Sequence, residues 1–206
     1  MTNDFDLKAK EWDMNPVHIE RSKAIAKQMI RLLPLTNNMC ALEFGAGTGV
    51  LSFLLKDRFA EITLMDSSRE MLKKAEEKIE DEDRSKFKTL FLNLATEDYH
   101  VESFDIIFSQ MVLHHINDTA AIFSKFYNLL NPGGILAIAD LYLEDGSFHE
   151  GDMSVHFGFD PEKLSAILLQ QGFINPAITS CFVIRKETSA EKTKEYPVFL
   201  LTAIKP

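Results

Sequence analysis

Residues 39–49 read MCALEFGAGTG, an apolar run that ends in a glutamate and continues into three glycines at alternating positions. Such a run, followed by the helix-forming residues 50–55, predicts a strand, a tight turn and a helix. Glycine adopts backbone conformations that other residues avoid, and it has no side chain to keep a ligand away from the main chain. We therefore expect the turn at Gly45, Gly47 and Gly49 to lie against a bound molecule.

The glycine spacing and the carboxylate of Glu43 favour a cationic ligand over a phosphate. A dinucleotide-binding turn has the pattern G-x-G-x-x-G, whereas this chain has G-x-G-x-G directly after Glu43-Phe44. Residues 42–49 resemble the first motif of class I S-adenosylmethionine-dependent methyltransferases, whose cofactor carries an ammonium and a sulfonium. Two alternatives stay open, a nicotinamide-dependent reductase and a βα turn that binds nothing.

A second block of sequence carries the same resemblance. Residues 103–109 predict a buried strand, residues 119–130 a helix and residues 135–140 another strand. MVLHHI follows the first strand and LLNPGG precedes the last. This order closely resembles small-molecule methyltransferases of class I, of the type 11/12 group, over residues 42 to about 140. The resemblance implies a Rossmann-like α/β fold of seven strands, mostly parallel, with an antiparallel C-terminal strand.

The rest of the pattern agrees with that fold. Helices are predicted over residues 17–33, 68–80 and 161–171, and strands over residues 61–65, 88–92, 177–184 and 196–204, with a hairpin loop at 185–195. Alternating strands and helices predict a parallel sheet with right-handed crossovers, whatever the family. At 206 residues the chain is expected to be one domain. It divides into an N-terminal helical arm or lid, residues 1–36, and a core, residues 37–206.

The resemblance implies a set of cofactor-binding residues: Glu43, Gly45, Ala46, Gly47, Gly49, Asp66, Ser67, Asn93, Leu94, Ser109 and Gln110. Asp66 ends the second strand about 20 residues after the first glycine, where a carboxylate accepts hydrogen bonds from ribose hydroxyls. Its alternative role is to cap the following helix. Asn93 takes the position that binds the adenine amine and Leu94 supplies a backbone amide. In another register Glu97 or Asp98 would replace Asn93.

Histidines supply the candidates for catalysis. His114 and His115 follow a strand at the edge where such folds bind ligands, and His149 and His156 lie in an irregular stretch, residues 144–160. Each is either a substrate contact or general base, or a structural histidine bonded to nearby backbone. We take His149, His156 and His114 as catalytic candidates, and Trp12, His149 and His156 as substrate or lid residues. Trp12 is alternatively a hydrophobic anchor of the arm.

Composition excludes several other classes. A net charge of -9 without a cluster of Lys and Arg argues against a nucleic-acid partner. No apolar run is long enough for a membrane span or a signal peptide, so the expected location is cytoplasmic. Cys40 and Cys181 are expected to be free buried thiols. No metal is expected, because His149, Glu150, Asp152 and His156 match no established ligand spacing.

The predicted function is methyl transfer from S-adenosylmethionine to a small-molecule acceptor. The reaction is an in-line attack on the sulfonium methyl, in which alignment supplies much of the acceleration. A base is needed only for a protonated acceptor, and a histidine of near-neutral pKa would serve. The alternative is a non-catalytic module that binds S-adenosylmethionine or S-adenosylhomocysteine.

Overall fold

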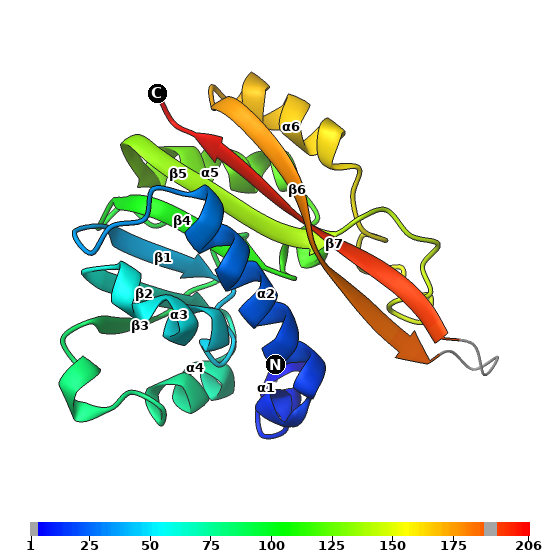
Figure 1. The fold of residues 1–206 in the computed structure, drawn as a ribbon, viewed down its shortest axis with the longest axis horizontal. Helices are drawn as coiled ribbons and strands as arrows, with labels where there is room; N and C mark the ends of the chain where they lie inside the picture. Colours follow the sequence, from blue (N-terminus) through cyan, green and yellow to red (C-terminus); the bar gives the residue numbers. More distant parts are fainter. Residues whose placement is uncertain (1–3, 188–192) are drawn as a thin grey trace.

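The structure is a computed structural model that describes residues 4–187 and 193–206 (Figure 1). Its helices are α1 (Asp4–Lys8), α2 (Pro16–Leu32), α3 (Val50–Leu55), α4 (Arg69–Glu76), α5 (Thr119–Leu129) and α6 (Pro161–Gln170), and its 3-10 helices are η1 (Trp12–Met14), η2 (Lys56–Arg58), η3 (Asp81–Asp83) and η4 (Leu113–His115). Its strands are β1 (Cys40–Phe44), β2 (Glu61–Asp66), β3 (Phe87–Phe91), β4 (Phe104–Gln110), β5 (Leu130–Leu141), β6 (Ile174–Glu187) and β7 (Thr193–Ile204).

The strands form one seven-stranded sheet in the order β3-β2-β1-β4-β5-β7-β6. Strands β1 to β5 run parallel, and β7 pairs antiparallel with both β5 and β6. The predicted α/β fold with an antiparallel C-terminal strand is confirmed. The strand order reverses between β1 and β4, and open α/β sheets bind ligands outside the carboxyl ends of the strands at such a point.

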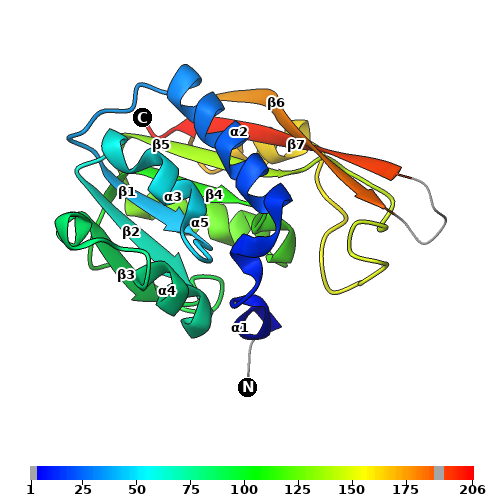
Figure 2. The same ribbon diagram turned by 60° about the horizontal axis from the view of Figure 1, so that its bottom comes forward.

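Helices cover both faces of the sheet, which explains why its central strands are almost entirely apolar. Leu51 of α3 and Leu72 of α4 belong to one core, together with residues of α2. Phe126 of α5 and Leu168 of α6 belong to the core on the other face. Figure 2 shows α2 and α3 on the same side of the sheet.

Helix α2 lies within one residue of its predicted range, and its buried face includes polar residues. The side chain of Asn15 caps its start by accepting a hydrogen bond from Val17 N–H at 3.0 Å. Ala26 and Met29 are buried, and so are Arg21 and Ser22, whereas Ile30 is exposed. The reason is that Ser22 Oγ donates to Gln110 Oε1 at 3.0 Å, so the helix presents polar groups to the end of β4.

The C-terminal hairpin is longer than its sequence suggests. Strand β6 continues to Glu187 and β7 begins at Thr193, so the charged ends of the predicted loop 185–195 are strand. Arg185 Nε lies 2.9 Å from Glu195 Oε1. This ion pair between the two strands stabilises their pairing, although both residues are charged. The middle of the predicted loop lies outside the described residues.

Two other boundaries also moved. Strand β5 begins at Leu130 rather than Ile135, because Gly133 N–H donates to Lys205 O at 2.8 Å and Lys205 N–H donates to Gly134 O at 2.9 Å. The C-terminal residues therefore hold residues 131–134 within the sheet. Helix α4 ends at Glu76 rather than residue 80, because its last turn tightens into i→i−3 hydrogen bonds, one of them from Ile79 N–H to Glu76 O at 3.1 Å.

Both cysteines are free thiols, as predicted, but each is half-buried rather than buried. Cys40 opens β1 at the edge of the core, and Cys181 Sγ donates to Val198 O at 3.4 Å from β6. Burial raises the pKa of Cys181 to about 12, so this thiol is unreactive at neutral pH. Among the described residues no helix combines the length and the apolar character that crossing a bilayer requires.

Candidate active site

The loops after β1 to β5 meet at one edge of the sheet and, with the N-terminal arm, enclose a cavity of about 770 Å³. The loops contribute residues 44–47, 65–67, 92–96, 110–112, 114–118, 121, 122, 125, 148, 149, 152, 154 and 155, with Met71 of α4. The arm contributes Phe5, Lys8, Trp12, His18 and Arg21. A cavity of this size can hold a drug-sized ligand.

Most of the residues that the sequence assigned to the site do line this cavity. They are Gly45, Ala46, Gly47, Asp66, Ser67, Asn93, Leu94, Gln110, Trp12, His114 and His149. Four assigned residues do not: Glu43, Gly49, Ser109 and His156. Each of these four supports a wall of the cavity from behind, as described below.

The three glycines of the turn all have positive φ, but they serve different purposes. A Cβ on Gly45 would lie 2.4 Å from Val112 Cγ2, and one on Gly49 would lie 3.0 Å from Phe53 Cε2, so both positions are filled by packing. A Cβ on Gly47 would have only Trp12 Nε1 at 3.8 Å and Met71 Sδ at 3.9 Å. Gly47 is therefore the glycine of this turn that exposes its main chain to a ligand.

Glu43 lies under the glycine turn and is fully buried. Its Oε2 accepts hydrogen bonds from Ser52 Oγ at 2.5 Å and from Ser52 N–H at 3.3 Å, and its Oε1 has no hydrogen-bond partner among the described residues. Burial raises the pKa of Glu43 to about 8, against the hydrogen bonds from Ser52, so the carboxyl is mostly protonated at pH 7. Instead of meeting a cation directly, Glu43 fixes the turn to α3.

Asp66 joins the ends of β1 and β2. Its Oδ2 accepts a hydrogen bond from Gly47 N–H at 2.7 Å, and its Oδ1 accepts one from Ser68 N–H at 2.8 Å. Burial raises the pKa of Asp66, and the hydrogen bonds from Gly47 and Ser68 act in the opposite direction. Ser68 rather than Asp66 caps α4, because Ser68 Oγ accepts from Met71 N–H at 3.2 Å. The carboxylate keeps lone pairs for further donors from the cavity.

The loop after β3 places Asn93 and Leu94 on the cavity wall, whereas the alternatives Glu97 and Asp98 lie outside the lining. Asn93 Oδ1 accepts a hydrogen bond from Ala95 N–H at 3.2 Å, which orients the amide. Leu94 is buried. This geometry favours the register with Asn93 in the site.

At the end of β4, neighbouring residues have separate roles. Ser109 Oγ donates to Phe44 O at 2.8 Å, so this buried side chain ties β4 to β1 from behind the cavity. Gln110 faces the cavity and accepts from Ser22. Met111 has φ +56°, a strained conformation for a residue with a Cβ, where the chain bends into the cavity wall.

The N-terminal arm closes one side of the cavity. Thr48 Oγ1 donates to Asp13 Oδ1 at 2.5 Å, and Ser68 Oγ donates to Asp6 Oδ1 at 2.5 Å, so the arm is fastened to the loops after β1 and β2. Trp12 stands over the glycine turn, with its ring centroid 4.4 Å from that of His18. Trp12 is half-buried and lines the cavity.

Arg21 is a site residue that apolar periodicity does not identify. It reaches the cavity from α2 with a residue exposure of 6%, and its Nε has no hydrogen-bond partner among the described residues. Burial lowers the pKa of Arg21 to about 10 against the attraction of Asp140, so the guanidinium stays charged at pH 7. Asp140 makes its own hydrogen bonds to His114 and Leu141.

Three histidines gather at the same end of the cavity. Ring centroids of His114 and His115 are 4.2 Å apart, and that of His149 lies 4.9 Å from His114 and 5.5 Å from His115. Burial, then His114 and His149, lowers the pKa of His115 to about 4. Burial, then His114 and Lys186, lowers the pKa of His149 to about 4. Both imidazoles are therefore neutral at pH 7, not poised near neutrality as the sequence suggested for a base.

His156 is the one catalytic candidate that lies outside the cavity. Its ring Nε2 is 3.0 Å from Ile116 O, and its backbone N–H donates to His114 O at 2.8 Å. Both contacts join the loop after β5 to the loop after β4. The structural role is thus the one that the geometry supports for His156.

Residues 42–136 match a family described as a methyltransferase domain. Over these residues the chain is similar to methyltransferase domains, as the resemblance of its glycine turn implied. An uncharacterized methyltransferase of Mycobacterium tuberculosis is 29% identical over 121 residues, which is 57% of this chain and 59% of that protein. The match with this curated relative thus spans about three fifths of its length.

Solved structures share the methyltransferase fold over more of the chain. The methyltransferase in a complex with the Trm112 methyltransferase activator of Haloferax volcanii superposes with a TM-score of 0.79 at 14% identity, over 100% of this chain and 99% of that one. A phosphoethanolamine N-methyltransferase of Haemonchus contortus, solved with phosphomonomethylethanolamine and S-adenosylhomocysteine, gives 0.71 at 19% identity, over 88% of this chain and 52% of that one.

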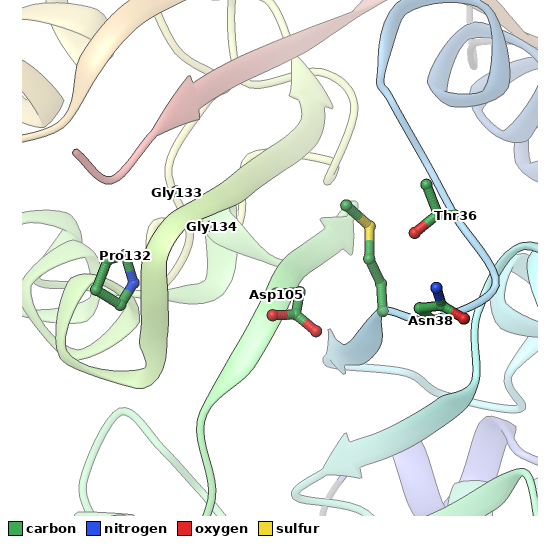
Figure 3. Close-up of a pocket in the computed structure, with 7 residues that line it drawn as sticks. Thr36, Asn38, Asp105, Pro132, Gly133 and Gly134 are labelled. Atoms are coloured by element: carbon green, nitrogen blue, oxygen red, sulfur yellow. The ribbon is translucent and has the colours of Figure 1, made fainter.

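A second hollow, of about 280 Å³, lies at the amino ends of the strands of this methyltransferase fold (Figure 3). Thr36, Asn38, Asp105 and Gly133 are among its lining residues. The carboxylate of Asp105 already accepts hydrogen bonds from Cys40 N–H and from Asn131 Nδ2, each at 2.8 Å. With its acidic group paired and its place opposite the ligand-binding edge, this hollow is structural.

Proposed function

We propose that this chain transfers the methyl group of S-adenosylmethionine to a small-molecule acceptor inside the cavity at the carboxyl edge of the sheet. The observation that carries the proposal is that one cavity joins the open main chain at Gly47 to the buried guanidinium of Arg21 and the histidines. A module that only bound the cofactor would need the first part and not the second.

The residues around Gly47 fit S-adenosylmethionine. A Cβ at Gly47 would fill space that is open, and Asp66 retains acceptor capacity for hydroxyl groups of the ribose. Asn93 and Leu94 offer an amide and a main chain to the adenine. When bound, this cofactor supplies an electrophilic methyl group on a sulfonium. The arm that carries Trp12 excludes water from the same space.

Arg21 supports an acceptor that carries a carboxylate or a phosphate. Arg21 is buried, and its Nε has no hydrogen-bond partner among the described residues. An anionic group on the acceptor would compensate the cost of burying this cation with charge-assisted hydrogen bonds. Such a group would fix the acceptor at the deep end of the cavity and direct its nucleophile towards the cofactor. We propose that Arg21 selects the acceptor in this way.

Alignment rather than proton removal is the expected source of the rate. With pKa values of about 4, His115 and His149 are weak bases at pH 7. Holding the acceptor and the methyl group in line reduces the entropic cost of the reaction instead. The acceptor atom is then one that is already unprotonated or that loses its proton readily.

Calorimetric titration tests the first half of the proposal. S-adenosylmethionine and S-adenosylhomocysteine are expected to bind with one site per chain, and NAD is expected not to bind. Methyl transfer is then followed through the release of S-adenosylhomocysteine. Binding without turnover on any acceptor would favour the non-catalytic module, and loss of all binding would leave only the fold.

The acceptor is sought with matched pairs that differ in one anionic group, such as phosphoethanolamine and ethanolamine. The anionic member of a productive pair is expected to have the lower KM, and Arg21→Met is expected to abolish the difference without changing the affinity for S-adenosylmethionine. Equal KM values for both members in the parent enzyme would contradict the role of Arg21.

A further inference from the structure

His114, His115 and His149 each offer one ring nitrogen within a common space, and these three atoms all lie within 4.8 Å of one another. His114 and His115 come from η4, directly after β4, and His149 comes from the loop after β5. All three residues line the cavity. The two loops thus bring His149 to a pair of histidines that lies 34 residues earlier in the sequence, which is why no ligand spacing was visible there.

Asp140 orients one of these imidazoles from behind. His114 Nδ1 donates to Asp140 Oδ1 at 2.7 Å, and both side chains are buried. This bond fixes the tautomer of His114 and leaves the lone pair of Nε2 free. A histidine that binds a metal through one ring nitrogen usually donates a hydrogen bond from its other ring nitrogen, often to a carboxylate as here.

His149 has a ring nitrogen that is open to a ligand. His149 Nε2 is buried and has no hydrogen-bond partner among the described residues, and a buried polar atom without a partner is uncommon. Imidazole binds a metal through an unprotonated ring nitrogen, which a buried nitrogen without a partner can supply. Asp152 lines the same cavity near these histidines and adds a carboxylate to this part of it.

We propose that His114, His115 and His149 bind a divalent transition metal, with zinc as the best-fitting class, through three imidazole nitrogens. Three nitrogen ligands with a position left open is the arrangement of catalytic zinc sites. A tetrahedral ion with Zn–N distances of about 2.0–2.1 Å brings its ligands closer together than the limit of 4.8 Å, by roughly 1 Å or more. His149 is on a loop and supplies that movement.

The fourth position opens into the cavity, because all three ligands line it. There the ion binds a nitrogen, oxygen or sulfur atom of the acceptor and holds it in place. This role rests on the proposed function, whereas the metal site itself does not. The two are therefore tested with separate measurements on the same protein.

The experiment uses the full chain without a polyhistidine tag, stripped with a chelator and then dialysed against Zn²⁺ or Co²⁺. We expect one metal ion per chain by elemental analysis, and intense visible absorption from four-coordinate Co²⁺. His149→Ala is expected to remove the binding. Asp140→Asn, which changes a positioning residue, is expected to weaken it by about 10- to 100-fold. His100→Gln, at an exposed histidine outside the cluster, is the matched control and is expected to bind like the parent.

Substoichiometric metal in the parent, or unchanged affinity in His149→Ala, would overturn the inference. His149 lies on a loop at the surface of the fold, so its variant is expected to fold even if Asp140→Asn does not. Calorimetry with S-adenosylmethionine on the same samples separates the two proposals. Cofactor binding without metal binding rejects only the metal site, and metal binding without cofactor binding rejects only the proposed function.

Discussion

Asp66 accepts a hydrogen bond from Gly47 N–H at 2.7 Å, so the carboxylate that ends β2 is joined directly to the turn that follows β1. One side chain therefore shapes the glycine turn and faces the cavity. A loss of Asp66 is expected to affect ligand binding in two ways, through the missing acceptor and through a looser turn.

Asp66→Ala is expected to weaken S-adenosylmethionine binding by about 1–3 kcal/mol, because charge-assisted hydrogen bonds are lost. Calorimetry measures the affinity and urea denaturation measures the free energy of unfolding. Asp66→Asn is the control that keeps the shape and removes the charge. Reduced stability with unchanged affinity would assign Asp66 a purely structural role.

Gly47→Val is expected to abolish cofactor binding, since the new side chain fills the open space before the main chain. Gly133→Val is the matched control, because Gly133 also has positive φ and open surroundings but lies at the opposite edge of the sheet. Backbone strain should lower the free energy of unfolding by a similar amount in both variants, and only Gly47→Val should lose cofactor binding. Similar affinities in the two variants would remove Gly47 from the site.

Asp13→Ala and Thr48→Val, alone and combined, test the arm as a lid. Each single change is expected to reduce cofactor affinity by about 1 kcal/mol, and the double change by less than the sum, because both remove the same hydrogen bond. Asp13 Oδ2 also lies 2.7 Å from Lys78 Nζ, so Lys78→Met serves as the control for the loss of that ion pair. If the losses of cofactor affinity in the two single variants add up in the double variant, the hydrogen bond between Thr48 and Asp13 does not contribute to closing the arm over the cavity.

Glu43→Gln is expected to flatten the dependence of stability on pH. The native state raises the pKa of Glu43 from 4.5 to about 8, so it keeps a proton that the unfolded chain has released. The stabilisation is full below pH 4.5 and is lost as the pH rises towards 8, by about 1.4 kcal/mol for each pH unit that separates the two pKa values. Urea denaturation of parent and variant at pH 5 and pH 8 measures the difference, and parallel curves would contradict the raised pKa.

Arg21→Met is expected to increase stability while it impairs methyl transfer. The guanidinium is buried, and its Nε lacks a partner among the described residues. Replacing it with an apolar side chain of similar length removes a desolvation cost, for a gain of about 1–2 kcal/mol in the free energy of unfolding. Thermal denaturation without ligand checks the gain. A variant that is less stable than the parent would mean that Arg21 is paired within the fold.

The fold follows from sequence because its signals are local. The glycine turn, the buried runs of β1 and β4, and the Asn131-Pro132-Gly133-Gly134 punctuation each report on neighbours in the chain. The predicted ends of strands were less accurate where contacts with distant residues determine them. Gly133 is an example, because its hydrogen bond to Lys205 holds it in the sheet. A single sequence gives no sign of such a contact.

The site was predicted in part for the same reason. Asp66, Gly47 and Asn93 follow strands, and the carboxyl ends of parallel strands share one edge. Arg21 lies instead on a helix, where a charged side chain gives no sign of its own burial, and only the fold reveals it. The grouping of His149 with His114 depends on how an irregular loop folds back, which no periodicity describes.

The contact between Gly45 and Val112 has a consequence for the evolution of such chains. Because a Cβ at position 45 would overlap Val112 Cγ2, an alanine there requires a smaller residue at position 112, and the two positions should change together among relatives. Val112 lies two residues before His114, so relief at this contact would also shift the start of η4. The packing of one glycine thereby limits which histidine arrangements a lineage can reach by single substitutions.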